Sequence, residues 1–289
     1  MIVALFGNDR QASKSRYVAG ILAALRASGF GICVERRFAR FVSKDLGISL
    51  DGCEVFEEMP PGVDMAVSVG GDGTFLSTAA AVGLCQVPIL GVNTGHLGFL
   101  ADVAPERAAD AFRAVAAGQY VVERHTLIRV IVDGADCCVQ PYALNEVALL
   151  KHDNSSTIDV TTTVDGELLT NYTADGLVVA TPTGSTGYSL SAGGPVIVPR
   201  AAALCLTPVA PHSLSIRPVV LCDDVELSLK VRSRSGNFLL AVDGKSLSLP
   251  DTVRVTLRRA AHTTGVVKVF HKAYFDTLRE KMGWGGTNF

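Results

Sequence analysis

The sequence predicts an α/β domain with a doubly wound, mainly parallel sheet, then a β-rich, sandwich-like domain and a C-terminal helix that returns to the first domain. Up to about residue 120, short apolar runs alternate with stretches of helical periodicity, which is typical of a parallel sheet covered by helices. Beyond Arg124 the chain is rich in Val, Leu and Thr, often in alternation and divided by Asp-Gly and Pro turns. Its 289 residues also suit about two domains.

The first domain is expected over residues 1–120 with the tail 271–289, and the second over 121–270. Apolar residues at helical spacing predict helices over 13–30, from Phe75 to Val82 and over 270–284. In the tail helix they place on one side Tyr274, Phe275, Leu278 and Met282. The apolar runs that predict strands in the first domain are 2–7, 31–37, 65–74 (which ends in glycines) and 87–93.

The charge distribution favours a small ligand over a polyelectrolyte. The chain has 26 Lys and Arg against 28 Asp and Glu, a net charge of −2, and no long basic run that would bind nucleic acid or an anionic membrane. The first apolar run is too short for a signal peptide and lacks a basic leader, so we expect a cytoplasmic protein. Two stretches without charged residues, 73–101 and 176–199, are interrupted by Gly and Pro, which indicates buried strands that lead into polar turns.

The first candidate site is the segment Gly70-Gly71-Asp72-Gly73-Thr74, between a predicted buried strand and a predicted helix. Glycines let backbone N–H groups approach an anion, and a helix N-terminus adds a positive dipole end. The segment matches neither Walker A nor GxGxxG. A carboxylate in a phosphate loop can accept a proton from an attacking hydroxyl or hold Mg²⁺, but Asp72 can also be a helix cap in a tight turn.

The second candidate site is the run that follows the predicted strand at Gly176–Ala180, with six Ser and Thr hydroxyls within residues 181–191. Small neutral donors and acceptors suit ribose hydroxyls and carboxamide edges, although such turns also occur without a ligand. The pair Asn145-Glu146 can bind an adenine edge or a ribose, or can form an ordinary turn. No HExxH or GxSxG motif is present, and His212 is interpreted as structural.

Together these motifs resemble the NAD kinase family. The segments that carry the resemblance occur in the family's order and spacing: GGDGT (70–74), GVNTGHLGFL (91–100), Asn145-Glu146, ADGLVVATPTGSTGYSLSAGGP (174–195), APHSLSIRP (210–218) and YFDTLREKMGW (274–284). GGDGT alone is shared with diacylglycerol and sphingosine kinases, whereas its combination with the second long motif is specific. The resemblance spans most of the chain.

The resemblance implies transfer of the γ-phosphoryl group of ATP, or of polyphosphate in some members, to the 2′-hydroxyl of the adenosine ribose of NAD. Asp72 corresponds to the general base. Gly70, Gly71, Gly73 and Thr74 correspond to the phosphate loop. A divalent metal, expected to be Mg²⁺, is required, and because the loop has no Lys, the metal is expected to supply the main positive charge. By analogy the protein is a homodimer or homotetramer, with no nucleic acid or membrane partner.

The NAD-binding positions are carried over from the family as well. Phe99 is expected near the adenine and Asp175 at the nicotinamide end. The full set that corresponds to NAD-contacting positions is Asp72, Gly73, Phe99, Asn145, Glu146, Thr173, Asp175, Thr183, Thr186, Gly187, Tyr188, Ser189, Leu190, Ser191, Ala210, Asp243 and Lys245.

Two positions depart from the family pattern. Thr173 stands where many bacterial members have a basic residue before the Asp-Gly pair, which predicts some activity on NADH as well as NAD. Gly187 stands where Ala is common, and the missing methyl group is expected to loosen the pocket slightly.

Three other functions remain open at the level of sequence. A GGDGT-type kinase for another hydroxyl acceptor, such as diacylglycerol, would need an apolar entry surface, and the hydroxyl-rich second loop argues against it. A non-catalytic dinucleotide-binding sensor is disfavoured by the intact Asp72. An NADP 2′-phosphatase would use the same pocket in reverse.

Overall fold

The computed structural model describes residues 1–8, 15–95, 98–152, 156–270 and 274–284, which form two compact units. The first unit contains Met1–Arg124 and Thr264–Phe289, and the second contains His125–Thr263. Parts of three predicted features lie outside the described residues: 13–14 of the first helix, His96 and Leu97 of GVNTGHLGFL, and 271–273 of the tail. No described helix has the length and apolar character that a membrane span requires.

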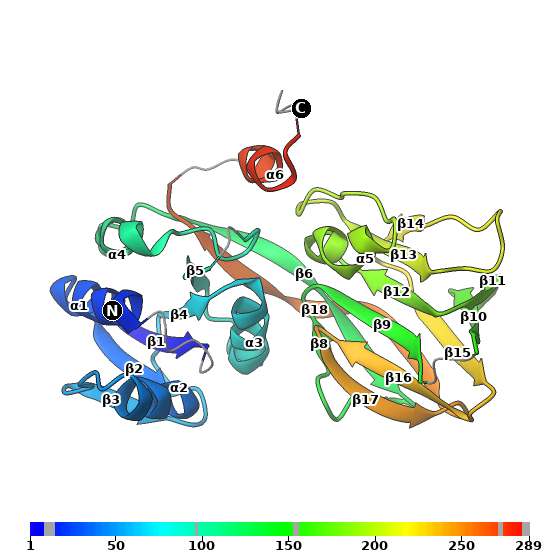
Figure 1. Cartoon of the computed structure of the whole chain (residues 1–289), viewed down its shortest axis with the longest axis horizontal. Helices are drawn as coiled ribbons and strands as arrows, with labels where there is room; N and C mark the ends of the chain where they lie inside the picture. Colours follow the sequence, from blue (N-terminus) through cyan, green and yellow to red (C-terminus); the bar gives the residue numbers. More distant parts are fainter. Residues whose placement is uncertain (9–14, 96–97, 153–155, 271–273, 285–289) are drawn as a thin grey trace. The chain divides into compact units, whose positions relative to one another are not determined.

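A parallel five-stranded sheet forms the centre of the first unit (Figure 1). Its strands are β1 (Ile2–Gly7), β2 (Gly31–Glu35), β3 (Cys53–Phe56), β4 (Met65–Gly70) and β5 (Ile89–Asn93). In the order β3-β2-β1-β4-β5, successive strands are added on one side of β1 up to β3 and on its other side from β4 onward. The direction of the strand order therefore reverses between β1 and β4. Ligand sites in such sheets lie at the carboxyl ends of the strands beside the reversal, which is where β4 ends.

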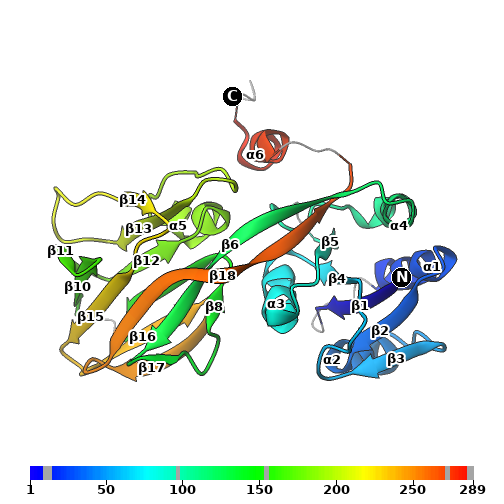
Figure 2. The same cartoon turned by 180° about the vertical axis from the view of Figure 1, so that it is seen from behind.

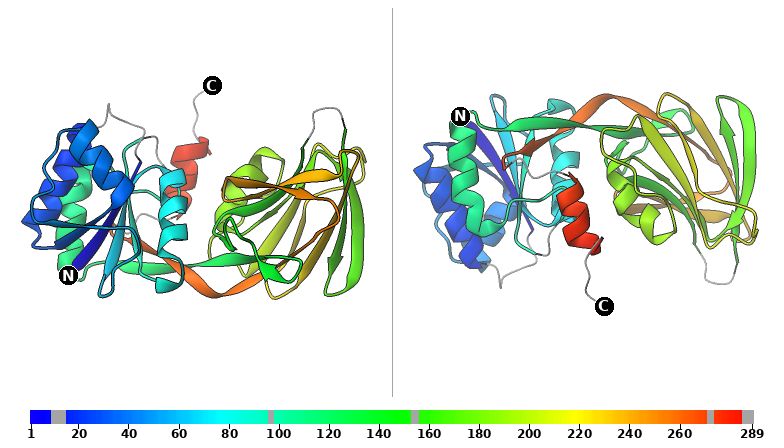
Figure 3. Two further views of the ribbon diagram at one scale, coloured as in Figure 1. Left: turned by 90° about the horizontal axis from the view of Figure 1, so that it is seen from below. Right: turned by 90° about the horizontal axis from the view of Figure 1, so that it is seen from above.

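Helices cover both faces of this sheet, as a doubly wound fold requires. They are α1 (Ser15–Ala27), α2 (Arg36–Arg40), α3 (Asp72–Val82) and α4 (Ala108–Ala116). The tail forms a further helix, α6 (Tyr274–Met282). Figure 3 shows α1 and α4 (dark blue and green) on one face and α3 (cyan) on the other. The apolar stripe of α1, with Ile21 and Leu25, packs with Phe112 of α4 against β1 and β4 in one core cluster. The predicted α/β fold of this unit is therefore confirmed.

One predicted strand is shorter than expected because an unpredicted helix follows it, and one predicted helix begins earlier than expected. The strand predicted over 31–37 ends at Glu35, whose carboxylate accepts hydrogen bonds from the N–H groups of Arg37 and Phe38 at 2.9 Å and so begins α2. Helix α2 continues directly into a π-helical turn over Phe41–Asp45. Helix α3 begins at Asp72 rather than near Phe75, with Gly71 in extended conformation as its N-cap.

The second unit is a β-sandwich. One of its sheets has the antiparallel order β14-β13-β12-β9-β16-β17 (Figure 2). These strands are β14 (Val219–Cys222), β13 (Ala203–Val209), β12 (Gly176–Ala180), β9 (Glu146–Lys151), β16 (Asn237–Val242) and β17 (Lys245–Pro250). The 3₁₀ turn Thr183–Thr186 and the short helix α5 (Tyr188–Ser191) follow β12.

The facing sheet of the second unit has the order β11-β10-β15-β18, and β6 pairs with β18. Its strands are β11 (Glu167–Ala174), β10 (Ile158–Val164), β15 (Leu227–Ser233), β18 (Arg254–Lys268) and β6 (Val121–Val132), with the short β7 (Ala135–Asp136) and β8 (Tyr142–Ala143) beside β6. Strands β6 and β18 run from one unit into the other, and Val266 of β18 pairs with Ile89 of β5 in the first unit.

Alternating apolar side chains from both sheets meet in one core cluster of the second unit. Tyr172 and Leu229 come from one sheet, and Leu149, Val179 and Phe238 from the other. The Asp-Gly hairpin turns that the sequence predicts are present, with positive φ at both residues of 133–134, 165–166 and 243–244. The predicted β-rich second domain is confirmed.

Candidate active site

The phosphate-loop candidate forms the junction between β4 and α3. Gly70 ends the strand, Gly71 caps the helix, and Asp72 is its first residue. Gly70 has to be glycine because a Cβ there would lie 2.2 Å from Oγ1 of Thr74. The junction therefore presents a helix N-terminus, with its positive dipole end, at the carboxyl end of β4.

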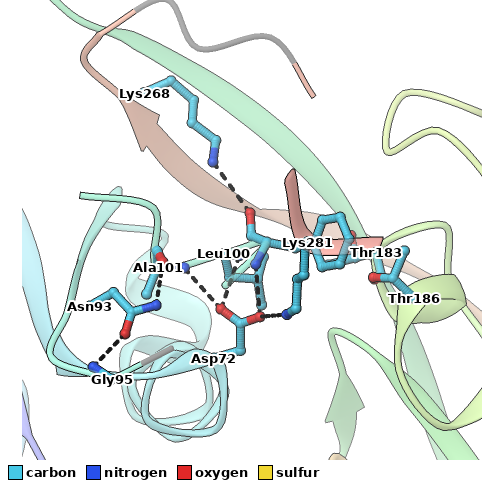
Figure 4. Close-up of polar contacts among 10 residues, drawn as sticks. Asp72, Asn93, Gly95, Leu100, Ala101, Thr183, Thr186, Lys268 and Lys281 are labelled. Carbon is cyan, nitrogen blue, oxygen red and sulfur yellow. Dashed lines mark hydrogen bonds and ion pairs between the residues drawn. The ribbon is translucent and has the colours of Figure 1, made fainter. Parts of the chain in front are cut away.

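The Asp72 carboxylate is held by backbone N–H groups of a loop distant in sequence (Figure 4). Its Oδ2 accepts a hydrogen bond from the N–H of Phe99 at 2.8 Å, and its Oδ1 accepts from Leu100 at 3.1 Å and Ala101 at 3.0 Å. A carboxylate offers about four lone-pair positions, so capacity remains for a further donor. The side chain is 28% exposed, which leaves it accessible to a ligand hydroxyl.

The loop that binds Asp72 is itself fixed at its C-terminal end. The Asn93 amide donates to the carbonyl oxygen of Ala101 at 3.0 Å, and Lys268 Nζ donates to Asp102 Oδ2 at 2.7 Å. Gly98 allows the close approach, because a Cβ at this residue would lie 2.0 Å from Asp72 Oδ1. The position of the catalytic candidate therefore depends on the loop from Gly98 to Asp102.

Helix α6 brings a lysine to this loop that sequence reasoning missed. Lys281 Nζ lies 3.7 Å from Asp72 Oδ2 and 4.6 Å from the centroid of the Phe99 ring. Tyr274 lies beside the same ring, with centroids 6.0 Å apart. The missed signal is spacing: Lys281 follows Tyr274 by seven residues and Leu278 by three, so it shares their helix face. Phe275, which the apolar pattern placed on that face, is 54% exposed.

In the second unit, Asn145 and Glu146 are positioned by Asp243. The Asp243 carboxylate accepts hydrogen bonds from three successive N–H groups, those of Leu144 at 2.7 Å, Asn145 at 2.8 Å and Glu146 at 3.1 Å. Burial raises the pKa of Asp243, and the three N–H groups and Lys245 act in the opposite direction. Asp243, predicted as an NAD contact, thus uses its carboxylate to fix the backbone of the predicted NAD-binding pair.

The side chains of this pair carry buried oxygens that lack a partner among the described residues. Asn145 Oδ1 and Glu146 Oε2 have no hydrogen-bond partner within the described part of the chain. Burial, and then the charge of Asp243, raises the pKa of Glu146 from 4.5 to about 7, while a hydrogen bond from the Tyr188 N–H opposes the shift. A Cβ at Gly187 would lie 2.9 Å from Glu146 Oε2. The carboxyl group of Glu146 therefore borders the space that a methyl group at residue 187 would occupy.

The hydroxyl-rich turn is mainly bonded within the protein. Thr181 donates to the carbonyl oxygen of Leu144 at 2.6 Å, and Ser185 to that of Pro182 at 2.7 Å. The residues of this turn that were predicted to contact NAD differ in burial and in hydrogen bonding. Three hydroxyls bond within the second unit: Thr183 to His125 Nδ1 at 2.7 Å, Thr186 to the Thr183 carbonyl oxygen at 3.4 Å and Ser189 to Thr207 at 2.8 Å. Leu190 is half-buried, and Tyr188 and Ser191 are exposed.

The residues expected near the nicotinamide form separate pairs. Asp175 Oδ1 lies 2.7 Å from Lys151 Nζ in an ion pair, a partner that the sequence did not reveal. Thr173 Oγ1 donates to Asp159 Oδ1 at 2.5 Å across β10 and β11. Ala210 and Lys245 are exposed. The structure thus places Gly187 and Tyr188 beside Glu146, and Asp243 holds the backbone of Asn145 and Glu146, while Thr173 and Asp175 each have their own charged partner.

Glu146 makes the stability of the second unit depend on pH. The pKa of Glu146 is about 7 in the folded protein, above its ordinary value of 4.5. The contribution of Glu146 to the free energy of unfolding is therefore fully present below pH 4.5 and is lost as pH rises through 7. The loss amounts to roughly 3 kcal/mol, at about 1.4 kcal/mol for each unit of pKa. Glu146→Gln, which cannot ionise, is therefore expected to raise the melting temperature relative to the wild type at pH 8 and much less at pH 5, measured by calorimetry. The exposed Glu167→Gln is the control, and an equal effect of Glu146→Gln at both pH values would contradict the prediction.

Comparisons with known proteins identify the family. The model described as "ATP-NAD kinase N-terminal domain" matches residues 3–120, and "ATP-NAD kinase C-terminal domain" matches 144–269. The NAD kinase of Bacteroides fragilis (strain YCH46) is 50% identical over 99% of this chain and 98% of its own, and that of Porphyromonas gingivalis (strain ATCC 33277) is 40% identical over 98% of both.

Two solved structures share the fold. Yeast NADH kinase complexed with NADH has a TM-score of 0.87 at 24% identity and covers 99% of this chain and 88% of that one. An NAD kinase from Archaeoglobus fulgidus in complex with ATP has a TM-score of 0.73 at 27% identity and covers 98% of this chain and 99% of that one. Since the two family models and the full-length relatives agree with the motifs and their geometry, this chain belongs to the NAD kinase family.

Proposed function

We propose that this enzyme, which phosphorylates NAD to NADP, uses Asp72 as the general base toward the 2′-hydroxyl of the adenosine ribose. The observation that carries the proposal is the fixed Asp72 carboxylate, bound by three backbone N–H groups and still able to accept one more hydrogen. An acceptor hydroxyl that donates to it would lie at the N-terminus of α3, where the helix dipole favours phosphate.

The donor we propose is ATP, which the Archaeoglobus fulgidus relative binds in its structure. The 2′-oxygen forms a bond to the γ-phosphorus while the bond from that phosphorus to the bridging oxygen of ADP breaks. The hydroxyl proton passes to Asp72, and ADP leaves. Because the transition state of phosphoryl transfer is loose, the base acts mainly by orienting the hydroxyl, which suits a carboxylate that three backbone N–H groups hold in place.

NAD recognition is proposed for the residues around Glu146. The unpartnered oxygens of Asn145 and Glu146 can accept hydrogen bonds from ribose hydroxyls or the adenine amino group. Tyr188 and Ser191 are exposed beside this pair and are the members of the hydroxyl-rich turn with the best access to a ligand. Phe99 remains our candidate for the adenine contact, and Asp175 for the nicotinamide end.

A divalent metal, which we expect to be Mg²⁺, fits this site only if it arrives with the nucleotide. No group of three or more His, Cys, Asp or Glu side chains among the described residues is arranged to hold a metal. Mg²⁺ in kinases is held largely by substrate phosphates and one or two carboxylates, so the ATP phosphates would be its main ligands here. When bound, it neutralises charge on the phosphates. We further propose a cytoplasmic homodimer or homotetramer.

Asp72→Asn tests the base. The carboxamide cannot take the proton, and its NH₂ group meets N–H donors in place of an acceptor, so turnover is expected to fall about 10²–10⁴-fold. NAD affinity, measured by calorimetry, is expected to change little. The assay is NADP formation from ATP, Mg²⁺ and NAD, read through an NADP-specific dehydrogenase, with a control lacking metal. Near-normal turnover of the variant would assign the base elsewhere.

Gly98→Ala tests the support of the base. Its Cβ would lie 2.0 Å from Asp72 Oδ1, so the carboxylate or the loop has to move. A displacement of about 1 Å can cost about 10²-fold in rate, and kcat for NADP formation is expected to fall by that order. Gly20→Ala is the matched control, because a Cβ at that helical glycine meets nothing within 4 Å. The prediction fails if both variants keep wild-type kcat.

Activity on NADH tests the nicotinamide end. Thr173 is neutral, and the charge of Asp175 is balanced by Lys151 at 2.7 Å, so neither side chain discriminates strongly between a cationic and a neutral nicotinamide ring. We expect measurable phosphorylation of NADH, compared with NAD as kcat/KM in the same preparation. A ratio of NADH to NAD turnover below about one in a hundred would contradict this.

A further inference from the structure

The phosphate loop of the first unit has no cation in its own sequence. No Lys or Arg occurs between Asp72 and Asp102, and the carboxylate of Asp72 adds a negative charge where a phosphate is expected. Transfer of a phosphoryl group spreads negative charge over its three equatorial oxygens, which enzymes stabilise with metal ions and with Lys or Arg. A positive side chain from elsewhere in the unit would therefore complete the loop.

Lys281 of α6 is in position to do so. Its Nζ lies 3.7 Å from Asp72 Oδ2, which is longer than a direct hydrogen bond, so the ammonium has donors available for a ligand. The side chain is 36% exposed and lies over the Phe99 ring. Figure 4 shows the Lys281 amine directed at Oδ2 of the carboxylate.

The helix is anchored so that this face stays on the loop. Leu278, one turn before Lys281, is only 3% exposed, and Thr277 is 5% exposed. Tyr274 packs against Phe99 two turns before Lys281. By contrast, Arg279 is exposed and forms an ion pair with Asp276 on the same helix. The two basic residues of the last turn therefore differ in environment although they are two positions apart.

We propose that Lys281 binds the phosphate oxygens of the donor and stabilises the γ-phosphoryl group during its transfer. This rests on the proposed role of Asp72. A hydroxyl that donates to Asp72 lies about 2.6–3.2 Å from the carboxylate, and the phosphorus that it attacks lies about 3–3.5 Å further. The phosphoryl oxygens thus fall within reach of an ammonium 3.7 Å from the same Oδ2, carried on a flexible four-carbon stem.

The test compares two variants of the full chain that remove one charge from the same helix. Lys281→Met keeps an apolar stem, and Arg279→Met is the matched control. We expect Lys281→Met to lower kcat about 10²-fold and to raise KM for ATP, with KM for NAD nearly unchanged, because the lost contact is to the transferring phosphate. Lys281→Arg is expected to recover part of the activity, since it restores the charge, and Arg279→Met to stay within about twofold of the wild type. Melting temperatures show whether each variant is folded.

A binding measurement separates this proposal from that of the base. ATP affinity is measured by calorimetry for Asp72→Asn and for the double variant Asp72→Asn with Lys281→Met, and only the double variant is expected to bind ATP more weakly. If Lys281→Met matches Arg279→Met in kcat and in ATP affinity, the role of Lys281 is overturned while that of Asp72 stands. A faster Lys281→Met enzyme would overturn it too, and would show that the lysine obstructs the Phe99 ring. A wild type that forms no NADP would refute the proposed function, and the ATP measurement would still decide on Lys281.

Discussion

The three hydrogen bonds from Phe99, Leu100 and Ala101 to Asp72 are the interaction on which the first unit's site depends. A carboxylate at a helix N-terminus beside a phosphate would be mobile and repelled if nothing else held it. Backbone donors fix it through three charge-assisted hydrogen bonds. The same contacts tie the end of β4 to the loop after β5, so the switch point of the sheet and the catalytic candidate are ordered together.

The second unit uses the same device with the roles exchanged. Asp243 also binds three successive N–H groups, but here the carboxylate is the support and the loop carries Asn145 and Glu146, the side chains that we propose to bind NAD. The tight Asp-Gly turn between β16 and β17 places Asp243 at positive φ, which projects its side chain onto the start of β9. In both units, then, an aspartate in a local turn motif binds the backbone N–H groups of a segment far along the chain.

Local patterns predicted much of the fold, because periodicity and turn chemistry act over short distances. The parallel sheet, the sandwich and the Asp-Gly hairpins follow from them, whereas α2, β3 and α4 were not predicted and the start of α3 at Gly71 was misplaced. Asp72 lies at the junction of a strand and a helix as its motif indicated, while its role as the base stays a prediction. The support by Asp243 and the approach of Lys281 could not be predicted, since both depend on which distant segments the folded chain brings together.

The Glu146 region shows why such a site is costly to keep. Its buried carboxyl group and the Asn145 carboxamide each have an oxygen without a partner in the described chain, and such an oxygen costs about 1–3 kcal/mol. A well-packed apolar pair would be more stable but could not bind a ribose or an adenine edge. Gly187 keeps the carboxyl group in place, since a methyl group there would press on Oε2. A ligand that donates hydrogen bonds to both oxygens removes this cost on binding, so part of the stability given up in the free protein returns as affinity for that ligand.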